Sequence, residues 1–185
     1  MIEPMMTEPA KNQLTFREYE QLPEGAPYQL IGGELTMTPS PTFDHQDVLY
    51  NLAGHLRQFA EERGLGKVVC APIDVYLTET DVFQPDIIFI SHERKEIIRD
   101  RVHGAPDLVI ETLSSSTAYH DLVQKKRIYE QSGVKEYWIV DPQEKTIEVH
   151  ENREQEFRLI SKVRGMGVIR SALLKGFAVD VSTLF

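Results

Sequence analysis

The sequence predicts an α/β domain of the α+β kind, with a mixed β-sheet flanked by two main helices. Two short, apolar, β-branched runs at 84–90 and 106–113 contain prolines at their edges, which is typical of buried strands. Helical apolar periodicity covers 44–63 and 118–132. No internal repeat or linker composition interrupts the 185 residues, which suffice for one domain with a substantial core.

The first elements follow a polar N-terminal segment. Residues 1–13 contain two prolines and are expected to form a disordered leader, so the domain should cover 14–185. Thr15, followed three residues later by Glu18, predicts a capping box at the start of a short helix. A glycine pair at the centre of 28–37 predicts a hairpin.

The two long helices have recognisable ends. Asp44 is expected to cap the first, which should run to about Arg63 and end at the glycines that follow. The second should end at Gly133. The remaining strands are expected near 67–77, 84–90, 106–113, 137–140, 146–150, 157–163 and 176–181.

Composition restricts the cellular setting. No apolar run approaches the length of a membrane span, so no membrane partner is expected. The N-terminus lacks the basic and apolar regions of a signal peptide. The single cysteine, Cys70, excludes an internal disulfide and suits a reducing compartment. We therefore expect a cytoplasmic protein.

The net charge argues against a strong nonspecific DNA-binding protein. At −9, the chain as a whole repels nucleic acid, whose binding usually depends on Lys and Arg contacts to phosphate. Metal ions and a local basic patch can offset such a balance.

Carboxylates lie at the edges of both apolar runs. Glu111 follows three apolar residues, in a position where an unpaired carboxylate is unfavourable. A divalent metal ion is a suitable partner because it takes several oxygen ligands. Asp86 and Asp107 each follow a proline, where Asp commonly bonds its own backbone in a turn. Asp107, Val109 and Glu111 should share one face of their strand.

Two lysines on the second helix are candidate cations. Leu122 and Tyr129 define the apolar stripe of this helix, and Lys125 and Lys126 flank it on opposite sides. Spacing does not choose between them. Lys125 could simply pair with Asp121 one turn earlier, and Lys126 could be solvated.

These residues match the needs of phosphodiester hydrolysis. The reaction requires hard oxygen ligands for Mg²⁺, an activated water and a cation near the developing charge. Asp86, Glu111 and a backbone carbonyl near Thr112 could bind Mg²⁺, with Mn²⁺ as a substitute, and a lysine could orient the water. Glycine patterns for phosphate loops or dinucleotides and a G-x-S-x-G elbow do not occur.

Three further polar residues have ordinary explanations. Glu34 follows the glycine turn and could be a solvated hairpin residue. His45 and Gln46 open the first long helix, where polar side chains commonly cap the backbone. His45 lacks the neighbouring His or Cys spacing of a structural zinc site, so no such site is expected.

The sequence resembles a known family in the order and wording of these motifs. The order Pro85-Asp86, then Glu111-Thr112-Leu113, is similar to the PD-(D/E)XK nuclease superfamily, and more closely to a large bacterial family of restriction-endonuclease-like proteins of unknown function. From about Leu14 onward, the matching words are Tyr28-Gln29-Leu30-Ile31-Gly32-Gly33-Glu34-Leu35, His45-Gln46, Gln84-Pro85-Asp86, Pro106-Asp107-Leu108-Val109-Ile110-Glu111-Thr112-Leu113-Ser114, Asp121 with Lys125 and Tyr129, and Gly133-Val134-Lys135-Glu136-Tyr137-Trp138-Ile139-Val140-Asp141-Pro142.

The resemblance implies a restriction-endonuclease-like core with Mg²⁺ bound at Asp86 and Glu111. Leu113 occupies the usual lysine position of the superfamily, and the resemblance selects Lys125, on the following helix, as its replacement. It also implies roles for Glu34 as an extra acid near the metal and for Gln46 as a polar helper.

Two functions remain open from the sequence. The first is a Mg²⁺-dependent endonuclease that hydrolyses DNA; the alternative is an inactive nucleic-acid-binding or protein-interaction module that retains the nuclease fold. Cutting both strands needs two active sites, so a homodimer is expected. Tyr137, Trp138 and the hairpin at Asp141-Pro142 are candidate interface residues, with core packing as the other role for Trp138.

Overall fold

The computed structural model describes residues 13–113 and 118–185, so all but the last residue of the expected leader lies outside the described residues. A six-stranded mixed sheet forms the centre, in the order β11-β10-β9-β8-β6-β3. Only β8 and β9 run parallel; the other neighbouring strands are antiparallel. Its strands are β3 (Gly66–Cys70), β6 (Ile87–Ser91), β8 (Leu108–Thr112), β9 (Glu136–Asp141), β10 (Thr146–Arg153) and β11 (Glu156–Arg164).

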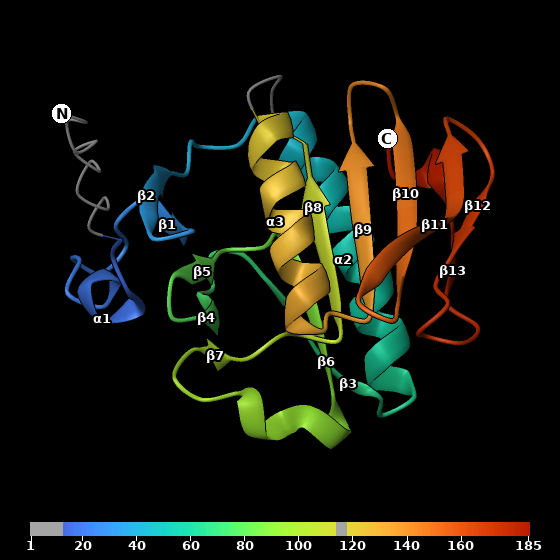
Figure 1. The fold of residues 1–185 in the computed structure, drawn as a ribbon. Helices are drawn as coiled ribbons and strands as arrows, with labels where there is room; N and C mark the ends of the chain where they lie inside the picture. The colour runs from blue at the N-terminus through green and yellow to red at the C-terminus, as the bar shows by residue number, and fades with distance from the viewer. Residues whose placement is uncertain (1–12, 114–117) are drawn as a thin grey trace, which may run out of the picture.

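The two long helices lie on opposite sides of this sheet (Figure 1). On one side, α2 (Phe43–Glu62) packs with Leu108 and Ile110 of β8. On the other side, α3 (Ala118–Ser132) packs with Val109, between those two residues in β8. Because side chains alternate along a strand, β8 supplies both layers of the core. The expected mixed sheet between two main helices is therefore confirmed.

A five-stranded sheet in the order β2-β1-β5-β4-β7 lies beside the central one. The expected hairpin is present as β1 and β2, and the capping box of Thr15 and Glu18 opens the short helix α1. Asp81 accepts the backbone N–H of Gly32 at 2.7 Å and thereby fixes the hairpin turn. The elements of this region are α1 (Phe16–Tyr19), β1 (Tyr28–Ile31), β2 (Glu34–Met37), β4 (Val75–Thr78), β5 (Asp81–Phe83) and β7 (Val102–His103).

One expected strand is divided between the two sheets. The prediction of a continuous strand over 67–77 is wrong, because β3 ends at Cys70 in the central sheet and β4 begins at Val75 in the other. Pro72 lies between them, and proline has no N–H with which to continue a ladder. Strands β5 and β7 were not predicted, since segments of two or three residues carry too little periodicity.

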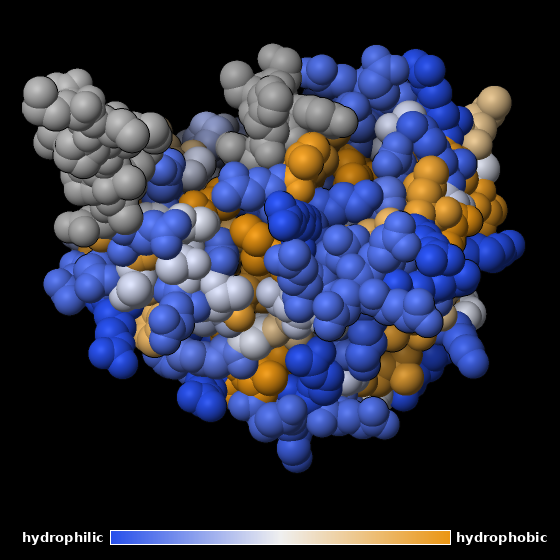
Figure 2. All heavy atoms as spheres, viewed as in Figure 1, coloured by the Kyte–Doolittle hydropathy of each residue, from blue (hydrophilic) through white to orange (hydrophobic). Residues whose placement is uncertain are grey.

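The C-terminal segment packs in the same hydrophobic core as α2. Here β13 (Ala178–Asp180) lies within the predicted range 176–181, and its partner β12 (Val168–Arg170) was not predicted. Two short 3₁₀-helices, η1 (His92–Ile97) and η2 (Val181–Thr183), were also not predicted. The visible face of the molecule is largely hydrophilic, with apolar residues in small separate patches (Figure 2).

The burial of Tyr137 and Trp138 bears on the expected dimer interface. Tyr137 and Trp138 are 0% exposed and belong to β9, an interior strand, so the suggestion that they form a dimer interface is wrong and both are core residues. Among the described residues, no helix has the length and apolar character needed to cross a membrane.

Candidate active site

A pocket of about 500 Å³ opens between the N-terminal hairpin, the first turn of α2, the end of β8 and α3. Five residues predicted from the sequence line it, and they are Gln46, Asp86, Glu111, Thr112 and Lys125. Glu34 is not part of the lining; it is an exposed residue at the start of β2, two positions before Thr36, which does line the pocket.

Asp86 is held at the entrance to β6. The antiparallel register of β6 and β8 pairs Ile87 with Ile110, which brings Asp86 alongside the end of β8. There its Oδ2 accepts the backbone N–H of Thr112 at 2.6 Å. The carboxylate is thereby fixed next to the Thr112 carbonyl by backbone geometry.

Glu111 lies on the face of β8 that is covered by α3. Its Oε1 accepts hydrogen bonds from Lys125 Nζ at 3.0 Å and from the hydroxyl of Tyr129 at 2.7 Å. Lys125 and Tyr129 are one helical turn apart and so reach the same point. Burial raises the pKa of Glu111, the charge of Lys125 opposes this rise, and the nearby charge of Asp86 adds to it.

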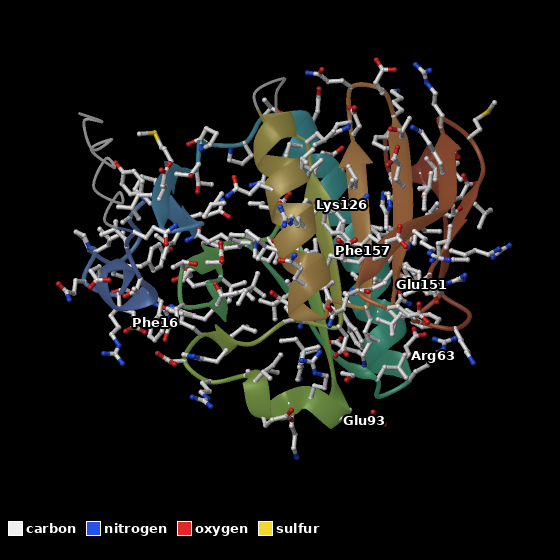
Figure 3. The ribbon with its side chains drawn as sticks, viewed as in Figure 1. Phe16, Arg63, Glu93, Lys126, Glu151 and Phe157 are labelled. Carbon is white, nitrogen blue, oxygen red and sulfur yellow. The ribbon has the colours of Figure 1, made fainter. Side chains whose placement is uncertain are left out.

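The structure places the two lysines in different surroundings. Lys125 is buried beside Glu111, with its Nζ 5.6 Å from the centre of the Phe83 ring. Lys126 projects from α3 on the side of β9 (Figure 3), and its Nζ is 3.1 Å from His150 Nδ1. Burial lowers the pKa of Lys126. Of this pair, only Lys125 lines the pocket.

His45 enters the site in a way that the sequence did not reveal. Its Nε2 is 3.1 Å from the carbonyl oxygen of Thr112 and 3.3 Å from Asp86 Oδ2. Burial acts to lower the pKa of His45, but the hydrogen bond and charge of Asp86 outweigh it and the pKa is raised. The helix is capped by Thr42, whose hydroxyl accepts the backbone N–H of His45, and not by Asp44 as predicted.

The polar groups suit a hard divalent ion. Asp86 Oδ2 and the Thr112 carbonyl oxygen both lie within 3.3 Å of the same nitrogen, so two oxygen donors of the kind that Mg²⁺ prefers are close together. In 13–113 and 118–185, no three His, Cys, Asp or Glu side chains form a ready metal cluster. A set that included the Thr112 carbonyl, as expected from the sequence, would add a backbone oxygen to the carboxylates of Asp86 and Glu111, which line the same pocket.

Sequence reasoning missed His45 and the contact of Tyr129 with Glu111. Tyr129 was assigned to the apolar stripe of α3, where its ring does lie, but its hydroxyl also reaches Glu111. His45 was interpreted as a capping residue because its partners, Asp86 and Thr112, lie far along the chain. The one hint in the sequence was the pair His45-Gln46, which is among the short motifs shared with the family.

The mixed sheet between two helices, with acids at the end of neighbouring strands, defines a restriction-endonuclease-like protein. A model of the Uma2 family, described as "Putative restriction endonuclease", matches residues 16–182, and the chain belongs to that family. This confirms the resemblance and the fold class predicted from the sequence.

One solved structure with the same fold is described as "a putative nuclease belonging to DUF820" from Anabaena variabilis. It is 18% identical, with a TM-score of 0.78, and the similarity covers 93% of this chain and 97% of that one. At this identity the likeness shows the fold alone. No curated protein matches the sequence.

Proposed function

We propose that the protein is a Mg²⁺-dependent endonuclease that hydrolyses phosphodiester bonds in DNA, with Mn²⁺ as a possible substitute. One observation carries this proposal: Asp86, Glu111, the Thr112 carbonyl and Lys125 gather at one pocket in a chain of this family. Because these residues come from separate parts of the sequence, their meeting at one pocket supports a shared chemical role.

The residues have distinct chemical tasks. Asp86, Glu111 and the Thr112 carbonyl would hold the ion, which when bound polarises the phosphate and lowers the pKa of water. Lys125 carries a buried ammonium 3.0 Å from Glu111, where it can orient the attacking water and stabilise charge on the phosphate. Leu113 cannot do this, since it has neither charge nor a hydrogen-bond donor.

The remaining predicted residues have supporting roles in this proposal. The exposed amide of Gln46 lines the pocket and can donate a hydrogen bond to a phosphate oxygen. Glu34 lies on the same face of β2 as Thr36 and stays a proposed extra acid at the margin. A homodimer that presents two pockets to the two DNA strands also remains a proposal; light scattering should give twice the monomer mass.

A noncatalytic module with the same fold is the competing function. Two observations favour it: the net charge of −9, and the salt bridge between Lys125 and Glu111, which compensates both buried charges without an ion. Such a module would bind a nucleic acid or a protein and would leave DNA intact.

A plasmid assay separates the two functions. The wild-type protein should convert supercoiled DNA to nicked or linear forms with Mg²⁺ or Mn²⁺, and EDTA should stop the reaction. Asp86→Asn should be inactive. Asp100→Asn is the matched control, because this side chain is 81% exposed and lies outside the pocket; it should cleave at the wild-type rate. Intact plasmid with every ion, despite DNA or protein binding, would favour the noncatalytic module.

A further inference from the structure

We infer that His45 is itself a ligand of the metal ion, so that the pocket favours a transition-metal ion that accepts imidazole, such as Co²⁺ or Fe²⁺, over Mg²⁺. The inference rests on the metal site of the proposed function. It adds a nitrogen donor to the oxygen donors of Asp86, Glu111 and Thr112, and it concerns which ion is bound.

The position of the His45 ring supports its role as a ligand. The His45 residue is 6% exposed, and its Nε2 points at the two atoms expected to bind the ion. Adjacent ligands of an octahedral ion, each about 2.1 Å from it, lie about 3.0 Å apart. The distances of 3.1 Å to the Thr112 carbonyl oxygen and 3.3 Å to Asp86 Oδ2 are close to this spacing.

The hydrogen-bonding capacity of His45 Nε2 also supports a bound ion. One imidazole N–H can make only one well-aligned hydrogen bond, yet Nε2 faces two acceptors. Asp86 Oδ2 already accepts the backbone N–H of Thr112 at 2.6 Å. An ion between Nε2, Asp86 Oδ2 and the Thr112 carbonyl oxygen would engage all three atoms. If His45 made only a hydrogen bond, its contact with either the Thr112 carbonyl oxygen or Asp86 Oδ2 would be poorly aligned.

The chemistry of the donors then sets the preference. Imidazole nitrogen suits Fe, Ni, Cu and Zn ions, whereas Mg²⁺ binds oxygen and keeps much of its water. A site with His45 beside the oxygen donors of Asp86, Glu111 and Thr112 should therefore bind Co²⁺ more tightly than Mg²⁺. Without His45, the same oxygens should discriminate much less between the two ions.

Calorimetric titration of Co²⁺ and of Mg²⁺ into the full-length protein tests this preference. His45→Ala should weaken Co²⁺ binding by about 10-fold or more and change Mg²⁺ binding by less than about threefold. His55→Ala is the matched control, because His55 is an exposed residue of the same helix outside the pocket, and it should bind both ions like the wild type. Equal Co²⁺ affinity in wild type and His45→Ala would overturn the inference.

His45→Gln guards against a folding defect. Glutamine keeps a side-chain donor for the Thr112 carbonyl but removes the imidazole ligand. If His45 only anchors α2 to β8, this variant should bind Co²⁺ like the wild type, and the inference fails. If His45 is a ligand, the variant should lose about as much Co²⁺ affinity as His45→Ala.

Proton NMR of the Co²⁺-loaded wild type tests the same point and does not depend on whether a variant folds. A ligating imidazole should give an exchangeable, strongly downfield-shifted N–H proton resonance, from the buried Nδ1 of His45. Absence of this resonance, while Asp86→Asn abolishes Co²⁺ binding, would reject His45 as a ligand and leave the proposed metal site intact. Absence of any Asp86-dependent ion binding would reject both.

Discussion

The two ends of β8 each carry a buried carboxylate, but the surroundings of the two groups differ. At the start, Asp107 is 0% exposed and accepts the Ser91 N–H at 2.8 Å, with Lys135 Nζ at 2.7 Å. At the other end, Glu111 bonds Lys125 and Tyr129 beside an open pocket. A buried acid alone therefore does not mark a candidate site; Glu111 differs in that it borders a pocket that Asp86 and Lys125 also line.

Glu136 of β9 is the ladder partner of Leu108, so it lies near Asp107 at the start of β8, away from the pocket. We call this the closed end of β8 and the Glu111 end the open end. Like Asp107, Glu136 has its carboxylate fully engaged by nearby donors. Its carboxylate accepts hydrogen bonds from Trp138 Nε1, the Ser171 hydroxyl and the backbone N–H groups of Ala172 and Leu173, all between 2.7 and 2.8 Å. These four donors use the lone pairs of both oxygens and connect the C-terminal segment to the central sheet. Such a group has a structural role.

The largest expected effect comes from disturbing this closed end. Glu136→Gln should lower the free energy of unfolding by about 3 kcal/mol, because its amide would face backbone N–H donors that need an acceptor. Urea denaturation measures the loss. Glu144→Gln, at an exposed turn, is the control and should change stability little. If the two variants were equally stable, Glu136 would not have this structural role.

At the open end, the main effect should be on turnover. Lys125→Met should keep the fold, since Glu111 can take up a proton when its cation is removed, but should reduce the cleavage rate by about 10²-fold. Lys126→Met should do much less, because Lys126 contacts His150 outside the pocket. Rates of plasmid cleavage test this, and equal losses in both variants would contradict the assignment of Lys125.

The pH dependence of stability should differ between the two ends. Burial acts to raise the pKa of Asp107, but Lys135 and the Ser91 N–H outweigh it and hold that pKa below its usual 3.8. The stability from Asp107 is therefore present above pH 3.8 and lost as the pH falls through the folded value. Burial raises the pKa of Glu111 above 4.5, so its contribution is full below pH 4.5 and lost as the pH rises.

Urea unfolding across a pH series checks these signs. Asp107→Asn should flatten the acid side of the stability curve, and Glu111→Gln should remove a decline on the side above pH 4.5. Changes of the same sign in both variants would contradict the comparison of the two ends.

The sequence predicted the regular parts of this fold well. Both long helices, the β1–β2 hairpin and the buried strands β6 and β8 carry strong periodicity or clear turn residues. The change of sheet near Pro72 was not predictable in the same way, because both strands look alike locally. The contacts of His45 depend on how α2 packs against β8, which local patterns do not encode.

Calorimetric titration of Mg²⁺ into wild type and Asp86→Asn tests the central claim most directly. Asn can still accept the Thr112 N–H, so the variant should fold with a stability within about 1 kcal/mol of the wild type. We predict that the wild type binds Mg²⁺ and that Asp86→Asn does not. Equal binding by both proteins, or no binding by the wild type, would contradict it.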